Sequence, residues 1–152
     1  MKLTRSKTSG EGLVVILVFC VIILGIGWYL YSTRASTEKE GIRYGHEVVD
    51  RLVVKHDRSL LDQDLDAQAK TEMPPSQRDY MIQRFTQLGV PAPPIKIDDN
   101  VSFDNGFFHA HGVFTATLNY PGQAATLQIA VSQGDTKWLI NNITLSMGTQ
   151  PH

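Results

Sequence analysis

Two histidines one residue apart have the clearest potential for chemistry in this sequence. His109 and His111 lie in a run of alternating apolar and polar residues, and alternate residues of a β-strand point to one face of a sheet. Two imidazoles on one face suit a zinc site, which also needs a third protein ligand. The other histidines, His46, His56 and His152, have no spacing that commits them to this role. His109 and His111 are therefore weak metal candidates, and we expect two surface histidines with no metal and no cofactor.

Three alternating aspartates, Asp62, Asp64 and Asp66, imitate the start of a calcium-binding loop. The sixth position of that loop requires glycine and the twelfth requires glutamate, but Ala67 and Met73 stand there. We therefore reject a calcium site and expect a solvated acidic turn.

One carboxylate falls at an apolar position of a predicted strand. In residues 95–103 Asp99 has the same parity as four apolar residues: Ile95, Ile97, Val101 and Phe103. A carboxylate buried in a pocket has a raised pKa and could act as a general base. The interpretation that we favour is a bulge at Asp98 and Asp99, which would turn the side chain of Asp99 to water.

No catalytic signature follows from the rest of the chain, so we predict no catalytic residue and no enzymatic activity. The sequence has no glycine-rich phosphate loop, nucleophile elbow or zinc-protease helix. Its single cysteine, Cys20, allows no intrachain disulfide. Asn142-Ile143-Thr144 is a glycosylation triplet, but its predicted place in a strand argues against use.

An apolar run without a charged residue or histidine extends from Leu13 to Tyr31. At about 1.5 Å per residue it would form a helix of roughly 28 Å, which matches the ~30 Å hydrocarbon core of a bilayer. The basic residues Lys2, Arg5 and Lys7 suit a membrane anchor and a cleaved signal peptide equally. We favour the uncleaved anchor, because the apolar part of a signal peptide has only about 7–15 residues.

Aromatic side chains cluster at the end of this run. Trp28, Tyr29 and Tyr31 are predicted to lie at the membrane interface, where amphipathic rings are enriched. The basic residues on the two sides of the run tie in number, but the tail carries the free amino group and only Glu11 opposes it. We therefore expect a single-pass protein of a bacterial inner (cytoplasmic) membrane, with its N-terminus in the cytoplasm and its large domain in the periplasm.

The charge balance argues against one class of partner. The chain has 14 Lys and Arg against 15 Asp and Glu, and its net charge is −1. A nucleic-acid-binding domain concentrates positive charge, so we expect no nucleic-acid partner.

The first part of the large domain has helical patterns. Thr37 and Glu40 have the spacing of a capping box, and a helix is predicted from about residue 37 to residue 55, which either starts there or continues the membrane helix without a break. A short helix is expected around Leu60, Leu61 and Leu65. A third helix is expected with Ser76 as its cap, Gly89 at its end, and a core-facing stripe formed by Tyr80, Met81, Phe85 and Leu88.

The second part, after a rigid corner at residues 90–94, has the period of strands. Four strands are expected, with turns at Asp104-Asn105-Gly106, Pro121-Gly122 and Gly134-Asp135. In the last strand the apolar parity slips between Ile140 and Ile143, which predicts a bulge at Asn141-Asn142.

These patterns predict an α+β protein: an N-terminal transmembrane helix, then helices packed on a curved antiparallel sheet of about four strands. The expected division is a cytoplasmic tail (1–12), a transmembrane helix (13–31), a juxtamembrane segment (32–36), an extracytoplasmic domain (37–147) and a C-terminal tail (148–152).

The helices near residues 37–55 and 76–88, and the final run Trp138-Leu139-Ile140-Asn141-Asn142-Ile143-Thr144-Leu145, resemble the nuclear transport factor 2-like, cystatin-like α+β superfamily. The resemblance covers about residues 37–147 and implies a sheet that wraps the helices as a half-cone. This superfamily includes enzymes, ligand-binding proteins and assembly modules, so the fold does not choose among these functions.

By elimination we expect a non-enzymatic accessory subunit of a larger membrane complex, either energy-transducing (respiratory or photosynthetic) or for secretion or envelope assembly. Its partners would be other integral membrane proteins and the lipid bilayer. The alternative is a membrane-tethered small-molecule-binding domain or enzyme that uses a pocket between sheet and helices. The small inner residues Ala110, Gly112 and Ala116 could leave room for a ligand or let the helices approach closely.

Overall fold

The computed structural model describes residues 10–104 and 109–148, with side chains from residue 12 onward. The chain forms two units, residues 1–36 and residues 37–152. The α+β class is confirmed: a long apolar N-terminal helix is followed by short helices and a four-stranded antiparallel open sheet.

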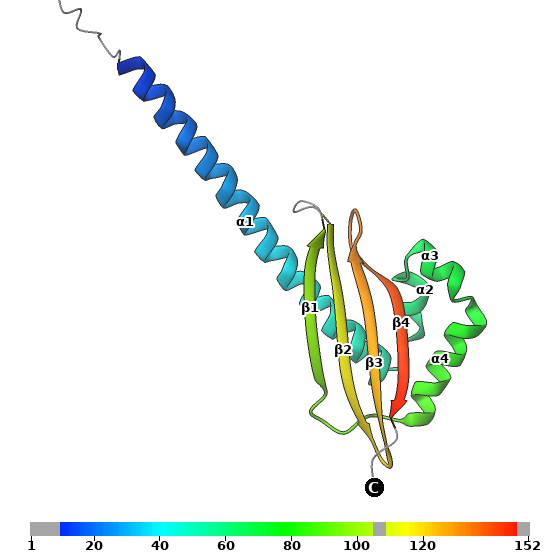
Figure 1. Cartoon of the computed structure of the whole chain (residues 1–152). Helices are drawn as coiled ribbons and strands as arrows, with labels where there is room; N and C mark the ends of the chain where they lie inside the picture. The colour runs from blue at the N-terminus through cyan, green and yellow to red at the C-terminus, as the bar shows by residue number, and fades with distance from the viewer. Residues whose placement is uncertain (1–9, 105–108, 149–152) are drawn as a thin grey trace, which may run out of the picture. The chain divides into compact units, whose positions relative to one another are not determined.

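Helix α1 (Gly10–Val53) is one continuous helix (Figure 1). The capping box at Thr37 therefore does not start a helix, because residues 32–36 contain no glycine or proline to interrupt the preceding one. Thr33 fits the helix by donating its hydroxyl to the carbonyl of Tyr29 at 2.9 Å. The helix ends two residues earlier than expected, and His56, at a φ of 51°, turns the chain away from the helical path.

Two short helices replace the one predicted around residues 60–65. Helix α2 (Arg58–Gln63) and helix α3 (Ala67–Glu72) are each capped by the side chain of an aspartate, Asp57 and Asp66 respectively. Aspartate before a helix accepts hydrogen bonds from the free N–H groups of the first turn. The apolar spacing alone could not separate the two helices.

Helix α4 (Pro75–Leu88) lies close to its predicted position. The expectation that Ser76 caps it is wrong: Pro74 stands at the cap and makes no side-chain hydrogen bond. Pro75 takes the first turn, where its missing N–H costs nothing. Gly89 ends the helix, as predicted, with a φ of 76°, a value that glycine adopts readily.

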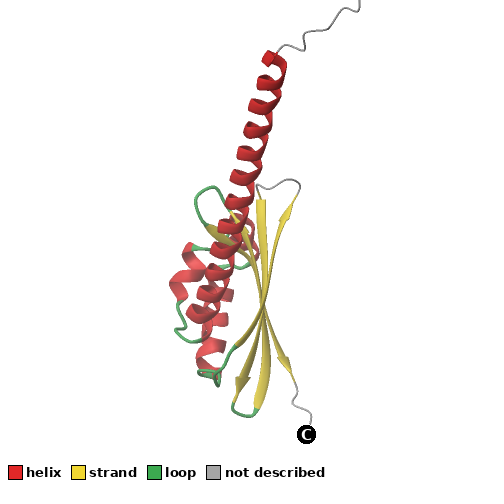
Figure 2. Ribbon diagram, turned by 90° about the vertical axis from the view of Figure 1, so that its left-hand side faces the viewer, coloured by secondary structure: helices red, strands yellow, loops and turns green. Residues whose placement is uncertain are grey.

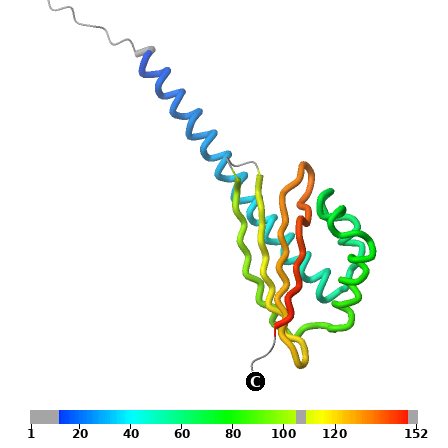
Figure 3. Tube along the Cα trace, turned by 45° about the vertical axis from the view of Figure 1, so that its right-hand side comes forward, coloured from blue at the N-terminus to red at the C-terminus, as the bar shows by residue number. Residues whose placement is uncertain are grey.

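The sheet is a meander in the order β1-β2-β3-β4, with all neighbours antiparallel (Figures 1 and 3). Its strands are β1 (Lys96–Asp104), β2 (His109–Tyr120), β3 (Gln123–Gln133) and β4 (Trp138–Gly148). The turn after β2 contains Gly122 at a φ of 86°. The turn after β3 is closed by the Gly134 N–H, which donates to the Lys137 carbonyl at 2.9 Å. The turn predicted at residues 104–106 falls largely outside the described residues.

The predicted bulge in β4 is confirmed. Ala130 of β3 pairs with Asn142 and Val131 pairs with Ile140, so Asn141 is the extra residue. This insertion restores the parity of the strand, and Ile140 and Ile143 are both buried, at 0% and 5% exposure.

All helices of the second unit lie on one face of the sheet (Figure 2). The inward side chains of β2 and β3 are buried against residues 48–53 of α1 and against α2 and α4. A Cβ built on Gly45 of α1 would overlap the ring of Phe114, and one on Gly112 would lie 2.8 Å from that ring. The small residues therefore let the backbones of helix and sheet approach closely around Phe114.

The outer edge of β4 is covered by the link between α2 and α3. Leu65 forms a parallel bridge with Ile140. The N–H of Asp66 donates to the carbonyl of Ile140 at 3.0 Å, and the N–H of Ile140 donates to the carbonyl of Asp64 at 2.7 Å. These bonds satisfy backbone groups that the edge of a sheet otherwise leaves unpaired.

Candidate functional site

The two metal-candidate histidines lie on the outer face of the sheet, at the start of β2. His109 pairs in register with Asp104 of β1, and the Nε2 atom of His111 lies 2.9 Å from a carboxylate oxygen of Asp104. Within the described residues no three His, Cys, Asp or Glu side chains form a metal-binding group. The pairing of Asp104 with these histidines follows from the register of β1 against β2, which the local sequence pattern does not contain.

The bulge expected at Asp98 and Asp99 is wrong, because β1 pairs with β2 without interruption and Asp99 stands opposite Phe114. The Asp99 carboxylate lies 3.5 Å from Nε2 of His46 on α1, and their side chains are 36% and 48% exposed. His46 also meets the Phe114 ring edge-to-face, with the ring centroids 6.4 Å apart. The inward parity of Asp99 therefore brings it to an open contact with His46 on α1, rather than into a closed pocket.

The three alternating aspartates, Asp62, Asp64 and Asp66, contact three different partners. Asp62 accepts a hydrogen bond from Arg78 Nη1 at 3.0 Å. Asp64 is only 14% exposed and accepts from Lys137 Nζ at 2.6 Å. Asp66 caps α3 and accepts from Asn141 Nδ2 at 3.0 Å. The expectation of a solvated turn is therefore wrong for Asp64 and Asp66, which hold elements together.

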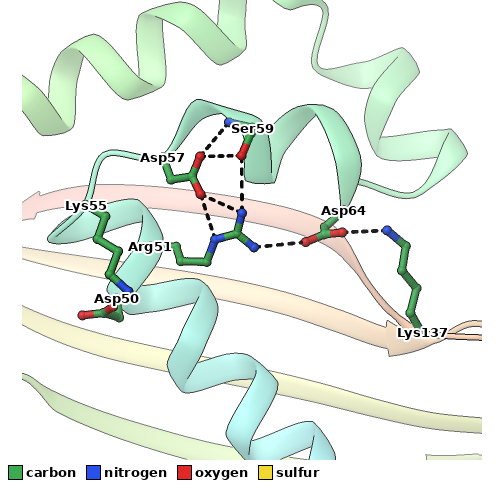
Figure 4. A network of polar contacts seen from close by, with 7 residues as sticks. All are labelled: Asp50, Arg51, Lys55, Asp57, Ser59, Asp64 and Lys137. Carbon is green, nitrogen blue, oxygen red and sulfur yellow. Dashed lines mark hydrogen bonds and ion pairs between the residues drawn. The ribbon is translucent and has the colours of Figure 1, made fainter.

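A polar network centred on Arg51 joins the end of α1 to α2 and to the turn before β4 (Figure 4). The guanidinium of Arg51 donates two hydrogen bonds to Asp57 Oδ2, at 2.9 and 2.6 Å, and lies 3.6 Å from Asp64. Ser59 donates its hydroxyl to Asp57 Oδ1 at 2.6 Å and its N–H to the same oxygen at 2.9 Å. These bonds, first from Ser59 and then from Arg51, lower the pKa of Asp57 to about 2. Every charged group of this network has a partner, so its role is structural.

Two buried phenols lie near the helices. Burial, and next the negative charge of Asp64, raise the pKa of Tyr44, and burial raises the pKa of Tyr120. Both stay neutral at ordinary pH, and neither hydroxyl has a hydrogen-bond partner within the described part of the chain. Without a hydrogen bond to a proton acceptor, neither phenol is set up for acid–base chemistry.

The outer face of β2, β3 and β4 has an unusual composition. These three strands contain no Asp, Glu, Lys or Arg, whereas about 25% of the residues of a typical soluble domain are charged. Neutral side chains stand opposite each other on neighbouring strands. Thr115 of β2 pairs with Gln128 of β3, and Gln128 pairs with Thr144 of β4. We call this the uncharged face; its members include Val113, Thr115, Thr117, Thr126, Gln128 and Thr144. No described element covers it (Figure 2).

A groove of about 440 Å³ opens between α4 and β4. We call it the α4–β4 groove; its lining consists of Met73, Gln77, Tyr80, Met81, Arg84 and Leu145. The sequence placed Tyr80 in the core, and this is wrong: Tyr80 is 61% exposed. Its helical stripe contains both core residues, such as the fully buried Phe85, and groove residues, which periodicity does not distinguish.

In the first unit, α1 contains one stretch apolar and long enough to cross a membrane, with a mean hydropathy of 2.9 over its most apolar window and no burial within the described structure. Trp28, Tyr29 and Tyr31 are 76%, 70% and 72% exposed. This is compatible with a single-pass anchor, and a signal sequence meets the same criteria.

Comparisons with known proteins add no relative: no family model, curated protein or solved structure matches the chain.

Proposed function

We propose that this chain is a non-enzymatic, single-pass accessory subunit of a larger membrane complex. The observation that carries the proposal is the uncharged face, which no described element covers. The cores of protein–protein interfaces are depleted of charged residues, and this face has none on three adjacent strands. A surface of this composition fits a protein partner better than permanent contact with water.

The apolar part of α1 supports a site of action at the bilayer. Its large side chains, apart from the half-buried Leu30, are more than half exposed, from Val18 at 51% to Trp28 at 76%. Transfer of apolar side chains of this extent from water into hydrocarbon lowers the free energy. The uncleaved helix would anchor the chain in a bacterial inner membrane, with Trp28, Tyr29 and Tyr31 at the periplasmic interface and residues 37–147 in the periplasm.

The second unit would be a cystatin-like half-cone of the nuclear transport factor 2-like superfamily. In support, helices come first and a four-stranded antiparallel meander follows, and the last strand carries the bulge that its sequence predicts. The sheet is twisted (Figure 2).

The test is purification of the full chain from its native membranes in a mild detergent, followed by mass spectrometry and an absorption spectrum. We expect a complex of fixed stoichiometry with other integral membrane proteins, and bound pigments or haems would identify an energy-transducing complex. A protein without partners would contradict the proposal.

A matched pair of variants makes this test specific. Gln128→Lys places a charge in the middle of the uncharged face, and Gln83→Lys places the same charge on the exposed side of α4. We expect the first to weaken the complex and the second to leave it intact. An equal effect of the two variants on the complex would show that the uncharged face does not bind the partner.

The second candidate is a membrane-tethered small-molecule-binding domain. The interior around Phe114 offers no support, since Gly45 and Gly112 there serve close packing. The α4–β4 groove does, because its volume of about 440 Å³ lies in the range of about 300–1,000 Å³ that is usual for ligand sites.

A further inference from the structure

The α4–β4 groove has a defined length and direction. Gln77 and Arg84 both line it and are seven residues apart on α4, so they lie on one side of the helix, about 10 Å apart along its axis. Tyr80 and Met81 lie between them, and Met73 and Leu145 complete an apolar lining. Methionine side chains adapt to irregular apolar shapes, which suits a flexible apolar ligand.

One end of the groove carries a positive charge with no acidic partner among the described residues. The guanidinium of Arg84 lies 5.9 Å from the centre of the Tyr80 ring. Arg51, Arg58 and Arg78 each pair with an aspartate, but Arg84 has no ion pair among the residues that the structure describes. A planar guanidinium of this kind binds a carboxylate through two parallel hydrogen bonds.

The other end offers a hydrogen-bond acceptor. A smaller pocket of about 210 Å³ shares Met73 and Gln77 with the groove and is also lined by Asn141. The Asn141 amide donates to Asp66, while its Oδ1 atom is buried and accepts no hydrogen bond in the described structure. The side chain has this position because Asn141 is the extra residue of the β4 bulge. A donor group on a ligand would satisfy this oxygen.

We propose that the α4–β4 groove binds a medium-length amphipathic carboxylate that carries a hydrogen-bond donor at its far end. The carboxylate binds Arg84, the apolar body lies on Tyr80 and Met81, and the donor reaches Asn141. This inference deepens the second candidate function, a ligand-binding domain, and does not depend on the accessory role.

The test uses the full-length chain in nanodiscs of zwitterionic lipid, with empty nanodiscs measured in parallel to subtract partition into lipid. The probe is 10-hydroxydecanoate, titrated by calorimetry. We expect saturable binding at one site per chain, and decanoate, which lacks the terminal donor, should bind more weakly. Uptake equal to that of empty nanodiscs would overturn the proposal.

Variants then test the named contacts. Arg84→Gln removes an exposed charge and should weaken binding at least about tenfold. Lys96→Gln removes a charge on β1, away from the groove, and should leave binding unchanged. Met81→Trp should block the groove sterically, and circular dichroism checks that each variant is folded. Saturable binding that Arg84→Gln does not weaken would contradict the proposed orientation, and so would equal affinities for the two carboxylates. Neither result would bear on co-purification with membrane partners.

Discussion

At the residue scale, aspartates organise the helical layer. Asp57, Asp64 and Asp66 stand close together in the sequence, yet each fixes a different contact: with Arg51, with Lys137 and with the first turn of α3. The alternation of Asp62, Asp64 and Asp66 suggested a cation loop, and only the structure separates the roles of these aspartates. Capping aspartates are recognisable in a sequence when a clear helical period follows them, but α2 and α3 have six residues each, which is too short to show one.

The network at Asp57 makes a prediction about acid stability. Its pKa in the folded chain is about 2, below the ordinary 3.8. Because the folded value is the lower one, the network stabilises the folded state at pH values above about 4, and this contribution is lost as the pH falls toward about 2. Asp57→Asn keeps an oxygen for Ser59 but cannot titrate, so urea unfolding should show a smaller loss of stability for it across this pH range. A variant with the same pH dependence as the unmodified chain would contradict this.

Gly45 makes a second prediction at this scale. Gly45→Ala would push a methyl group into the ring of Phe114, and overpacking of this kind costs about 1–3 kcal/mol. Gly27→Ala on the same helix has no neighbouring atom within 4 Å and serves as the control. Thermal unfolding should show a lower midpoint for Gly45→Ala alone, and Phe114→Leu in the same chain should restore part of the loss. An unchanged midpoint would contradict the close approach of α1 to the sheet.

At the element scale, the alternation of residues along each strand predicted the meander, its antiparallel order and the bulge in β4. Periodicity succeeds there because one face of the sheet is buried, so a slip of one residue reverses every side chain. At Asp99 the parity correctly indicated the inner face, and the bulge that we expected instead is wrong. The partner of Asp99 in the structure is His46. That contact joins residues far apart in the chain, and local pattern does not contain it.

The contact of Asp66 with both α3 and β4 predicts how much its replacement destabilises the domain. Asp66→Ala removes both the cap of α3 and the acceptor of the Asn141 amide, and we expect it to destabilise the domain by about 1–2 kcal/mol. Asp66→Asn, which keeps a capping oxygen, should cost less. Chemical unfolding of the two variants measures the difference, and equal losses would show that the cap has no role.

At the scale of the whole molecule, the apolar run and the uncharged face both lack charged residues and both suit a membrane complex, in which lipid or protein would cover them. The run was evident in the sequence, because its length and lack of charge need no structure to interpret. The uncharged face was not, since it became visible only when the register placed Thr115, Gln128 and Thr144 in one row across three strands. Both surfaces would be covered in a membrane complex.

The orientation of the chain is a prediction of its own. With the N-terminal tail in the cytoplasm, residues 37–147 lie inside sealed inverted membrane vesicles and resist added protease, because the bilayer separates the two. Detergent should remove this protection. Digestion of the domain in intact inverted vesicles would reverse the orientation.

The most direct test of the central claim, that a protein partner covers the uncharged face, is photo-crosslinking in native membranes. A photoreactive amino acid would replace Gln128 on the face, and in a second sample Gln83 on α4. We predict one discrete adduct between the Gln128 position and another membrane protein, and no such adduct from the Gln83 position. No adduct from the Gln128 position, or equal labelling from both positions, would contradict the account.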